Sequence, residues 1–430
     1  MKKILKYLKG TYRRVIRSIA FHPVLISLLC VILAMVALSL ENWEIVRSIK
    51  KNIPYFFIQD YETARSILSV LIGGIISLTV FSFSMVMVVL GQASSNFSPR
   101  LLPGLISSNK HQIILGIYVG TLLYCIIILT SLGALGVDAD TIGLSTMLAA
   151  VLSMVCIGLF VYFIHNISGA IQIHNIIDRI YRKCDDYAEK ELKRSGGSKV
   201  ALKAIDSSDW NVMRSDRSGY FRGFDSRLLK DSLEEQENQM EIIPYINQHV
   251  WQGMPLLRIK EVVNEDELEN LNFCIDMSSD RHESDRGIGG MIKLMEIAVK
   301  AMSPGINDPG TAIDAIAKLG ALLRKFLQFP SVTSEPIDGG KFILLKNNIP
   351  ASELMRIIVQ PIRHYAKQDS AVLFDMIGAL QFIARGPNIS NENKAVVAAE
   401  LAALKANILE EIVNEADRMQ LLKALDDKHV

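Results

Sequence analysis

Cysteine is scarce in this sequence, and it lacks the spacing that would give it a structural role. Five cysteines occur in 430 residues, and no two of them form a CxxC pair. Three of the five lie in apolar runs, where a free thiol is most often a buried packing residue. The sequence therefore points to neither a disulfide framework nor a zinc site, and we expect no metal and no cofactor.

The signatures of the common enzyme classes are also missing. There is no HExxH, no GxSxG, no Walker loop and no GxGxxG after a predicted strand. The eight histidines are scattered along the chain. No basic patch with interleaved aromatic residues occurs, which argues against a nucleic-acid partner. We therefore expect a protein that is not an enzyme and that binds no nucleic acid.

Charge is absent from four long apolar runs in the first 170 residues. These runs contain no Asp, Glu, Lys or Arg, and they cover residues 24–40, 66–90, 113–132 and 143–164. An apolar helix of about 17 to 25 residues crosses a bilayer. The sequence therefore predicts a basic N-terminal segment at 1–20 and a transmembrane domain of four helices at 21–168.

The flanks of these runs predict how the chain is oriented. Residues 1–174 carry a net charge of +7 and residues 175–430 a net charge of −6, which indicates a membrane part followed by a soluble part. The N-terminal arm and the second-to-third loop are basic, whereas the third-to-fourth loop carries only Asp138 and Asp140. Because short basic flanks stay inside, we expect both termini in the cytosol.

The rest of the chain is predicted to be predominantly helical. The fold class is a mainly α membrane protein, with four transmembrane helices followed by a cytosolic α+β region. A helical stalk is expected at 165–195, a small mixed α/β unit at 200–260, and a helical domain at 265–430. Strands are expected at 210–214, 219–224, 241–245 and 256–259, with a hairpin at 332–347. The predicted helices cover 225–237, 265–277, 285–302, 308–328, 351–366, 369–385, 391–413 and 415–427.

The second predicted span is unusually rich in small and hydroxylated residues. Projected at helical spacing, these residues form one stripe, which contains Gly73, Ser77, Ser84, Gly91 and Ser95, and it is widened by Gly74, Thr79, Ser82 and Gln92. Hydroxyl oxygens without charge suit the wall of a pore. Small residues at this spacing also suit close helix packing between protomers. Both interpretations stay open, and Asn96, Ser98 and Arg100 in the following loop are candidates for an inner mouth.

A second local signature is the segment AMSPGINDPGTA at residues 301–312. Pro304 and Gly305 end one helix, and Asp308 is a candidate N-cap of the next, with Pro309 at its first position. The segment is thus a tight corner between two helices. The alternative is a ligand or ion site lined by Asn307, Asp308 and Thr311.

Three segments together resemble one known family. They are FSFSMVMVVLGQASSNFSPRLL at 81–102, SGYFRGFD at 218–225 and the corner AMSPGINDPGTA. In this order they resemble the predicted bacterial membrane proteins grouped as domain of unknown function 2254 (DUF2254). Similar proteins carry Gln-Asp-Pro and then an arginine before the corner, where this sequence has Ser284-Asp285-Arg286 and then Gly289-Gly290-Met291. The resemblance implies four spans and a cytosolic domain in a bacterial cytoplasmic (inner) membrane, and it implies no established activity.

Two functional hypotheses from different classes follow from these observations. The first is a homo-oligomeric, channel-like pathway for ions or small solutes, with the second span lining or gating it. The second is a membrane-anchored regulatory or scaffold protein, whose cytosolic helical domain binds a partner or ligand. The expected partners are the lipid bilayer, further copies of the chain, and an ion or small ligand.

Overall fold

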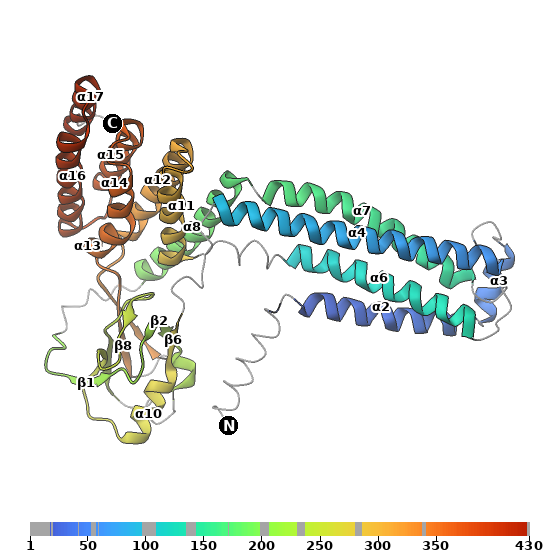
Figure 1. Ribbon diagram of the computed structural model, residues 1–430. Helices are drawn as coiled ribbons and strands as arrows, with labels where there is room; N and C mark the ends of the chain where they lie inside the picture. Colours follow the sequence, from blue (N-terminus) through green and yellow to red (C-terminus); the bar gives the residue numbers. More distant parts are fainter. Residues whose placement is uncertain are drawn as a thin grey trace. The chain divides into compact units, whose positions relative to one another are not determined.

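The computed structural model divides the chain into two compact units (Figure 1). We call Met1–Ser95 with Leu101–Gln172 the membrane unit, and Asn96–Arg100 with Ile173–Val430 the C-terminal unit. The structure describes residues 18, 20–41, 43–52, 57–58, 60–96, 109–134, 143–170, 172–197, 206–229, 237–279, 286–337 and 341–427.

In its described residues, the membrane unit contains four long apolar helices and one short helix. The long helices are α2 (Phe21–Leu40), α4 (Tyr61–Asn96), α6 (Asn109–Ala134) and α7 (Gly143–Ala170). Each is long and apolar enough to cross a membrane, so the four predicted spans are confirmed. The short helix α3 (Glu44–Asn52) follows α2. Every long helix extends beyond its predicted apolar run, because the residues next to the run continue the helical backbone.

Helix α6 is the centre of the membrane unit, and α4 is its most exposed member. In the most apolar 18-residue stretch of each helix, 44% of the residues of α6 are buried, but only 11% of those of α4. At the start of α2, His22 Nδ1–H donates to Oε1 of Gln112 at the start of α6 (3.0 Å). Helices α2 and α6 therefore run parallel, and α7 runs in the opposite direction because its start lies beside Glu41 at the end of α2.

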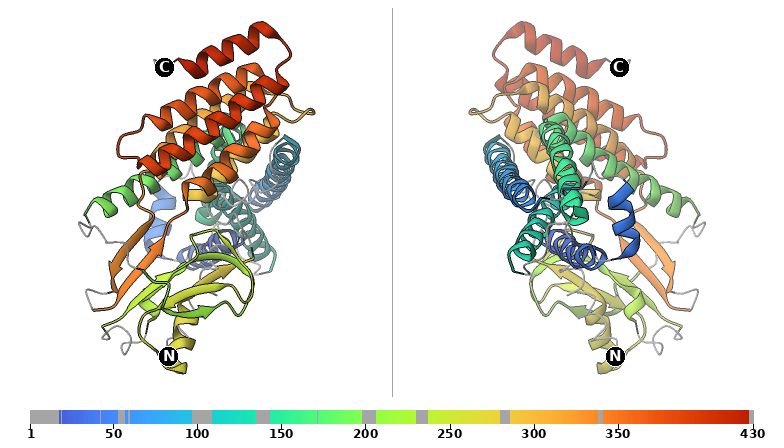
Figure 2. Two further views of the ribbon diagram at one scale, coloured as in Figure 1. Left: turned by 90° about the vertical axis from the view of Figure 1, so that its left-hand side faces the viewer. Right: turned by 90° about the vertical axis from the view of Figure 1, so that its right-hand side faces the viewer.

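In the C-terminal unit, helices form an array that begins with α8 (Ile173–Gly197). Figure 2 shows the helices of this unit side by side. They are α11 (Gly287–Ala301), α12 (Pro309–Phe326), α13 (Ala351–Leu354), α14 (Gln360–Tyr365), α15 (Ser370–Ala384), α16 (Asn391–Glu411) and α17 (Glu415–Asp426). A π-helical turn, η6 (Met355–Val359), joins α13 to α14. Pro361 accounts for the turn, because it has no N–H for the carbonyl of Ile357.

A ladder of ion pairs fixes α8 along α12. Asp178 pairs with Lys318 (2.9 Å), and Asp185 pairs with Lys325 (2.6 Å), so the residue numbers differ by 140 in both pairs. A constant difference means that the two helices run parallel. The apolar face of α8 is buried within its own unit, and its buried residues are Ile176, Ile177, Ile180, Cys184 and Ala188. The segment predicted as a helical stalk leading out of the membrane at 165–195 is, from Ile173 onward, part of the helical array.

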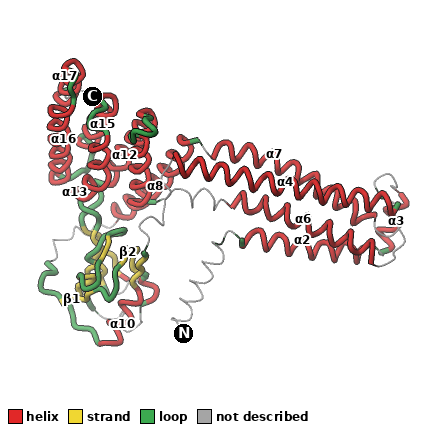
Figure 3. The backbone as a smooth tube through the Cα atoms, in the orientation of Figure 1, coloured by secondary structure: helices red, strands yellow, loops and turns green. Residues whose placement is uncertain are grey.

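Within the described residues of this unit, eight strands form two sheets (Figure 3). The five-stranded sheet has the order β1 (Asn211–Arg214), β5 (Pro255–Ile259), β3 (Gln239–Ile242), β8 (Ile343–Asn347) and β7 (Val332–Pro336). Its β3–β8 pair is parallel and its other pairs are antiparallel. The three-stranded sheet has the order β4 (His249–Val250), β2 (Gly219–Phe224) and β6 (Ile275–Ser278). Strands of both sheets contribute to one apolar core, together with α10 (Glu265–Cys274).

The predicted boundary between 260 and 265 does not divide the fold. Strands β6, β7 and β8 come after it and complete the two sheets. The helix predicted at 265–277 ends at Cys274, because Ile275–Ser278 pairs with β2 and this pairing overrides local helix propensity. Within the described part of the helix predicted at 225–237, only the 3₁₀ turn η4 (Ser226–Leu228) forms.

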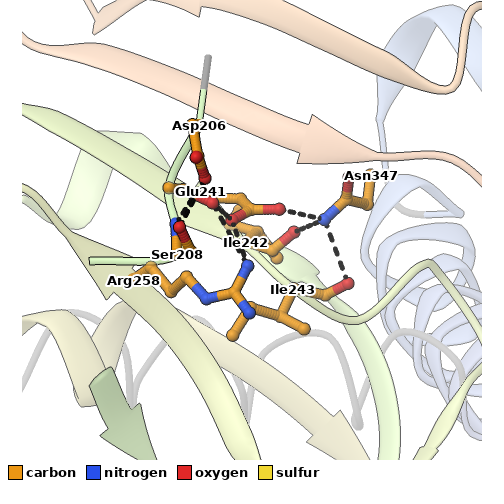
Figure 4. A network of polar contacts seen from close by, with 8 residues as sticks. Asp206, Ser208, Glu241, Ile242, Ile243, Arg258 and Asn347 are labelled. Atoms are coloured by element: carbon orange, nitrogen blue, oxygen red, sulfur yellow. Dashed lines mark hydrogen bonds and ion pairs between the residues drawn. The ribbon is translucent and has the colours of Figure 1, made fainter. Parts of the chain in front are cut away.

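A polar network on the five-stranded sheet ties three of its strands together (Figure 4). Oε1 of Glu241 on β3 accepts from Asn347 Nδ2 on β8 (2.7 Å). Its Oε2 accepts from Ser207 Oγ (2.5 Å) and from Arg258 Nη1 on β5 (3.0 Å). Burial raises the pKa of Glu241, but these hydrogen bonds outweigh burial and hold that pKa below its ordinary value.

Replacing this carboxylate tests whether the network stabilises the sheet. Glu241→Gln should lower the free energy of unfolding by about 2 kcal/mol at pH 7, because charge-assisted hydrogen bonds become neutral ones. The folded-state pKa is lowered, so the wild type has this stability above the unfolded pKa of about 4.3 and loses it as the pH falls through the folded pKa.

Unfolding of the full chain in detergent, followed from pH 7 to pH 3, measures the effect. The gap between wild type and Glu241→Gln should close toward pH 3. Glu335→Gln is the matched control, because Glu335 lies on the same sheet but is exposed and pairs only across the surface with Lys346. A gap that is equal for both variants, or that does not depend on pH, would show that the network does not stabilise the sheet in this way.

Candidate functional site

The stripe of small and hydroxylated residues on α4 faces away from the other helices of its unit. Its residues Gly73, Ser77, Ser84, Gly91 and Gln92 are all exposed. A Cβ atom added at Gly73 or Gly91 would meet no heavy atom within 4 Å. The membrane unit therefore does not use these glycines for its own packing.

Helix α4 packs on its unit through different residues. Leu68 and Ile75 are buried, and Phe81 meets Phe160 of α7 edge to face with ring centroids 5.6 Å apart. The buried face and the stripe thus occupy different sides of α4. The stripe is open to contact with lipid, water or another chain.

Ser77 and Thr79 of α4 bond through their hydroxyl groups to their own helix, whereas Ser82, which widens the predicted stripe, is buried. Ser77 Oγ donates to the carbonyl oxygen of Gly73 (2.9 Å), and Thr79 Oγ1 donates to that of Ile75 (2.7 Å). A hydroxyl satisfied in this way is inexpensive to place in a membrane, and its oxygen still has a lone pair to offer. The stripe is therefore neutral and carries hydrogen-bond acceptors on its outer surface.

The remaining candidates at this end of α4 lie at the edge of what the structure describes. Ser95 and Asn96 belong to α4 by their backbone, but their side chains lie outside the described residues. Ser98 and Arg100 lie wholly outside them. The candidate site on α4 therefore does not include the predicted inner mouth.

Close helix packing by glycine does occur in the membrane unit, but on α6 instead of α4. Gly116 and Gly120 form a GxxxG pair that faces α2. A Cβ atom at Gly120 would lie 2.6 Å from Cys30 Sγ, and one at Gly116 would lie 3.0 Å from the Cα of Pro23. The sequence patterns above did not predict this contact, although a GxxxG motif in the third predicted span is typical of close helix packing.

A buried polar cluster lies at the end of the membrane unit where α2 ends and α7 begins. Glu41, only 3% exposed, pairs with Lys50 of α3. Its Oε1 accepts from the backbone N–H of Ser145 (2.6 Å), and Tyr124 Oη donates to the carbonyl oxygen of Ser145 (3.1 Å). Sequence reasoning missed this cluster too, because Glu41 directly follows a charge-free run and reads as an interfacial stop.

The corner at 301–312 is held by hydrogen bonds between its own residues. Asp308 caps α12: its Oδ1 accepts from Thr311 N (3.1 Å) and its Oδ2 from Thr311 Oγ1 (2.6 Å). Asn307 adopts the left-handed conformation (φ 47°), and Asp308 N–H donates to the carbonyl oxygen of Ala301 (2.9 Å). The three predicted residues do come together, on an exposed surface, and the bonds between Asp308 and Thr311 are those of a capped helix corner. Within the described ranges, no group of three His, Cys, Asp or Glu residues is placed to hold a metal ion.

Four membrane-length helices, followed in the chain by a unit of helices and two sheets, define a multi-pass helical membrane protein. The family model described as "Predicted membrane protein (DUF2254)" matches residues 16–381. The chain therefore belongs to this family, and the resemblance found in the sequence is confirmed.

Three uncharacterised relatives are distant in sequence. These proteins of Mycobacterium bovis and of two strains of Mycobacterium tuberculosis are 22% identical to this chain over 373 residues. The match covers 84% of this chain and 71% of each relative. No solved structure matches the chain.

The contrast between the glycines of α6 and α4 can be tested directly. Gly120→Val should destabilise the membrane unit by about 1 to 3 kcal/mol, because the new side chain collides with Cys30. Gly73→Val should leave the stability of the single chain nearly unchanged, because the added atoms enter open space. Thermal unfolding in mild detergent measures both, and equal destabilisation by the two changes would contradict the assigned packing.

The capped corner makes a separate prediction. Asp308→Ala should cost about 1 kcal/mol of stability in the C-terminal unit, because α12 loses its N-cap. Asp308→Ser should retain most of that stability, because serine also caps well. If the two variants are equally destabilised in a urea titration, capping is not the role of Asp308.

Proposed function

We propose that this protein forms a homo-oligomer in which α4 lines or gates a pathway for ions or small solutes. The observation that supports the proposal is the outward stripe on α4. It is small, neutral and hydroxylated, and its residues Gly73 and Gly91 have open space where a side chain would extend.

A second copy of the chain is a better match for this stripe than lipid alone. Lipid is as apolar as a leucine side chain, so it gains little from contact with glycine and serine. Another helix gains close van der Waals contact with glycine, and a file of water or ions gains hydrogen bonds from serine oxygens. Several α4 helices around one axis would supply both.

The proposed setting is a bacterial inner membrane with both termini in the cytosol. The basic N-terminal arm and the basic second-to-third loop support this orientation. Four crossings return the chain to the side from which it started, so the C-terminal unit would also lie in the cytosol.

Recording from purified protein in planar bilayers tests the pathway. Wild-type protein should give unitary currents, and Ser77→Ala, Ser84→Ala and Gln92→Ala should each change the conductance, because each removes a polar group from the proposed wall. Ser39→Ala is the matched control. Ser39 is an exposed serine of α2 whose hydroxyl also bonds to its own helix, at the carbonyl of Met35 (2.9 Å).

Three outcomes bear on the proposal. Currents that change with α4 and not with Ser39 support it. The absence of any current, or currents indifferent to all three changes in α4, contradicts the pathway. An oligomer without current, dissociated by Gly73→Val when its mass is measured in mild detergent, would instead favour a scaffold whose spans only assemble protomers.

A further inference from the structure

The buried cluster around Glu41 has the composition of an anion site. The backbone N–H of Ser145 is among the first four of α7, whose donors have no partner within the helix. The start of a helix also carries a partial positive charge, so it favours a negative group. Lys50 adds a full positive charge at the same carboxylate.

The only described negative charge in this cluster is the carboxylate of Glu41. It is 3% exposed and binds both the Lys50 ammonium group and the Ser145 N–H. The other titratable side chain that packs against the cluster is Tyr124 of α6, whose hydroxyl bonds to the Ser145 carbonyl oxygen. Removing the Glu41 carboxylate would take away the negative charge that now binds both the Lys50 ammonium group and the start of α7.

Ser145 also carries a hydroxyl group. The residue is fully buried, and within the described residues its Oγ has no hydrogen-bond partner. This hydroxyl is three bonds from the nitrogen that already binds Glu41. A buried, unpaired hydroxyl is costly unless a partner can reach it.

We infer that Glu41 occupies a small-anion site formed by Lys50 and the start of α7, and that a free anion such as chloride binds there when the carboxylate is removed. The carboxylate acts as a tethered ligand, and its removal leaves the Lys50 ammonium, the Ser145 N–H and the Ser145 hydroxyl to bind the anion. The site does not depend on whether α4 lines a pathway, so it stands apart from the function proposed above.

Thermal unfolding of the full chain in detergent tests this inference with chloride as the probe. Sodium chloride is compared with sodium gluconate at equal ionic strength, because gluconate is too large for a site that a carboxylate group fills. The unfolding temperature of Glu41→Ala should rise by a few degrees in chloride and saturate with concentration. Wild type should unfold at the same temperature in both salts, because its own carboxylate fills the site.

Two further variants make the result specific. Glu41→Ala with Lys50→Ala should lose the chloride effect, because the cation of the site is gone. Glu44→Ala should behave as the wild type, because it removes an exposed carboxylate three residues away and leaves Glu41 in place.

The outcomes either support or overturn the anion site. A saturable chloride effect in Glu41→Ala that Lys50→Ala abolishes supports it. Equal unfolding temperatures of Glu41→Ala in the two salts overturn it. If Glu41→Ala folds in neither salt, Glu41→Ser replaces it, because serine also removes the carboxylate and leaves its space open. Equal unfolding temperatures of that variant in the two salts also overturn the site. Such a result would not change the currents expected in planar bilayers, so the anion site and the pathway along α4 are tested independently.

Discussion

The requirement that backbone polar groups in hydrocarbon find partners inside the protein governs this structure. The four long helices satisfy their backbones internally, and Ser77 and Thr79 donate to carbonyls of their own helix. Charge in the membrane unit lies at helix ends, where Glu41 meets Lys50 and the start of α7. The spans are also held by close packing, which α6 provides against α2 through Gly116 and Gly120.

Helix α4 differs from the other spans in how it is attached to the membrane unit. Helices α2, α6 and α7 are held together by the glycine contact and by polar bonds at their ends. Helix α4 attaches through buried apolar residues such as Leu68 and Ile75, and turns its small residues outward. The proposed role of α4 in assembly follows from this difference, because three helices already form a unit without the stripe.

The sequence predicts the elements that depend on local pattern and misses those that depend on distant contacts. The four spans follow from charge-free runs, and α12 follows from its Asp308 cap. Strand β6 was missed because it exists only through pairing with β2. The buried partner of Glu41 was missed because Ser145 is 104 residues away.

The candidate site shows the same limit. The stripe on α4 is visible in the sequence as a helical pattern, but its direction is not, because exposure depends on where the neighbouring helices lie. Gly73 and Gly120 are both glycines in apolar spans, and only the structure separates the open position from the packed one.

If α4 lines a pathway, its outward stripe must be covered by the α4 helices of other copies around a polar path. Electron cryomicroscopy of the full-length protein in lipid nanodiscs tests this requirement most directly. We predict a symmetric oligomer in which Gly73, Ser77 and Ser84 of neighbouring copies face a common axis. A single copy in each disc, or an oligomer whose α4 stripes face lipid, would contradict the proposed role of α4.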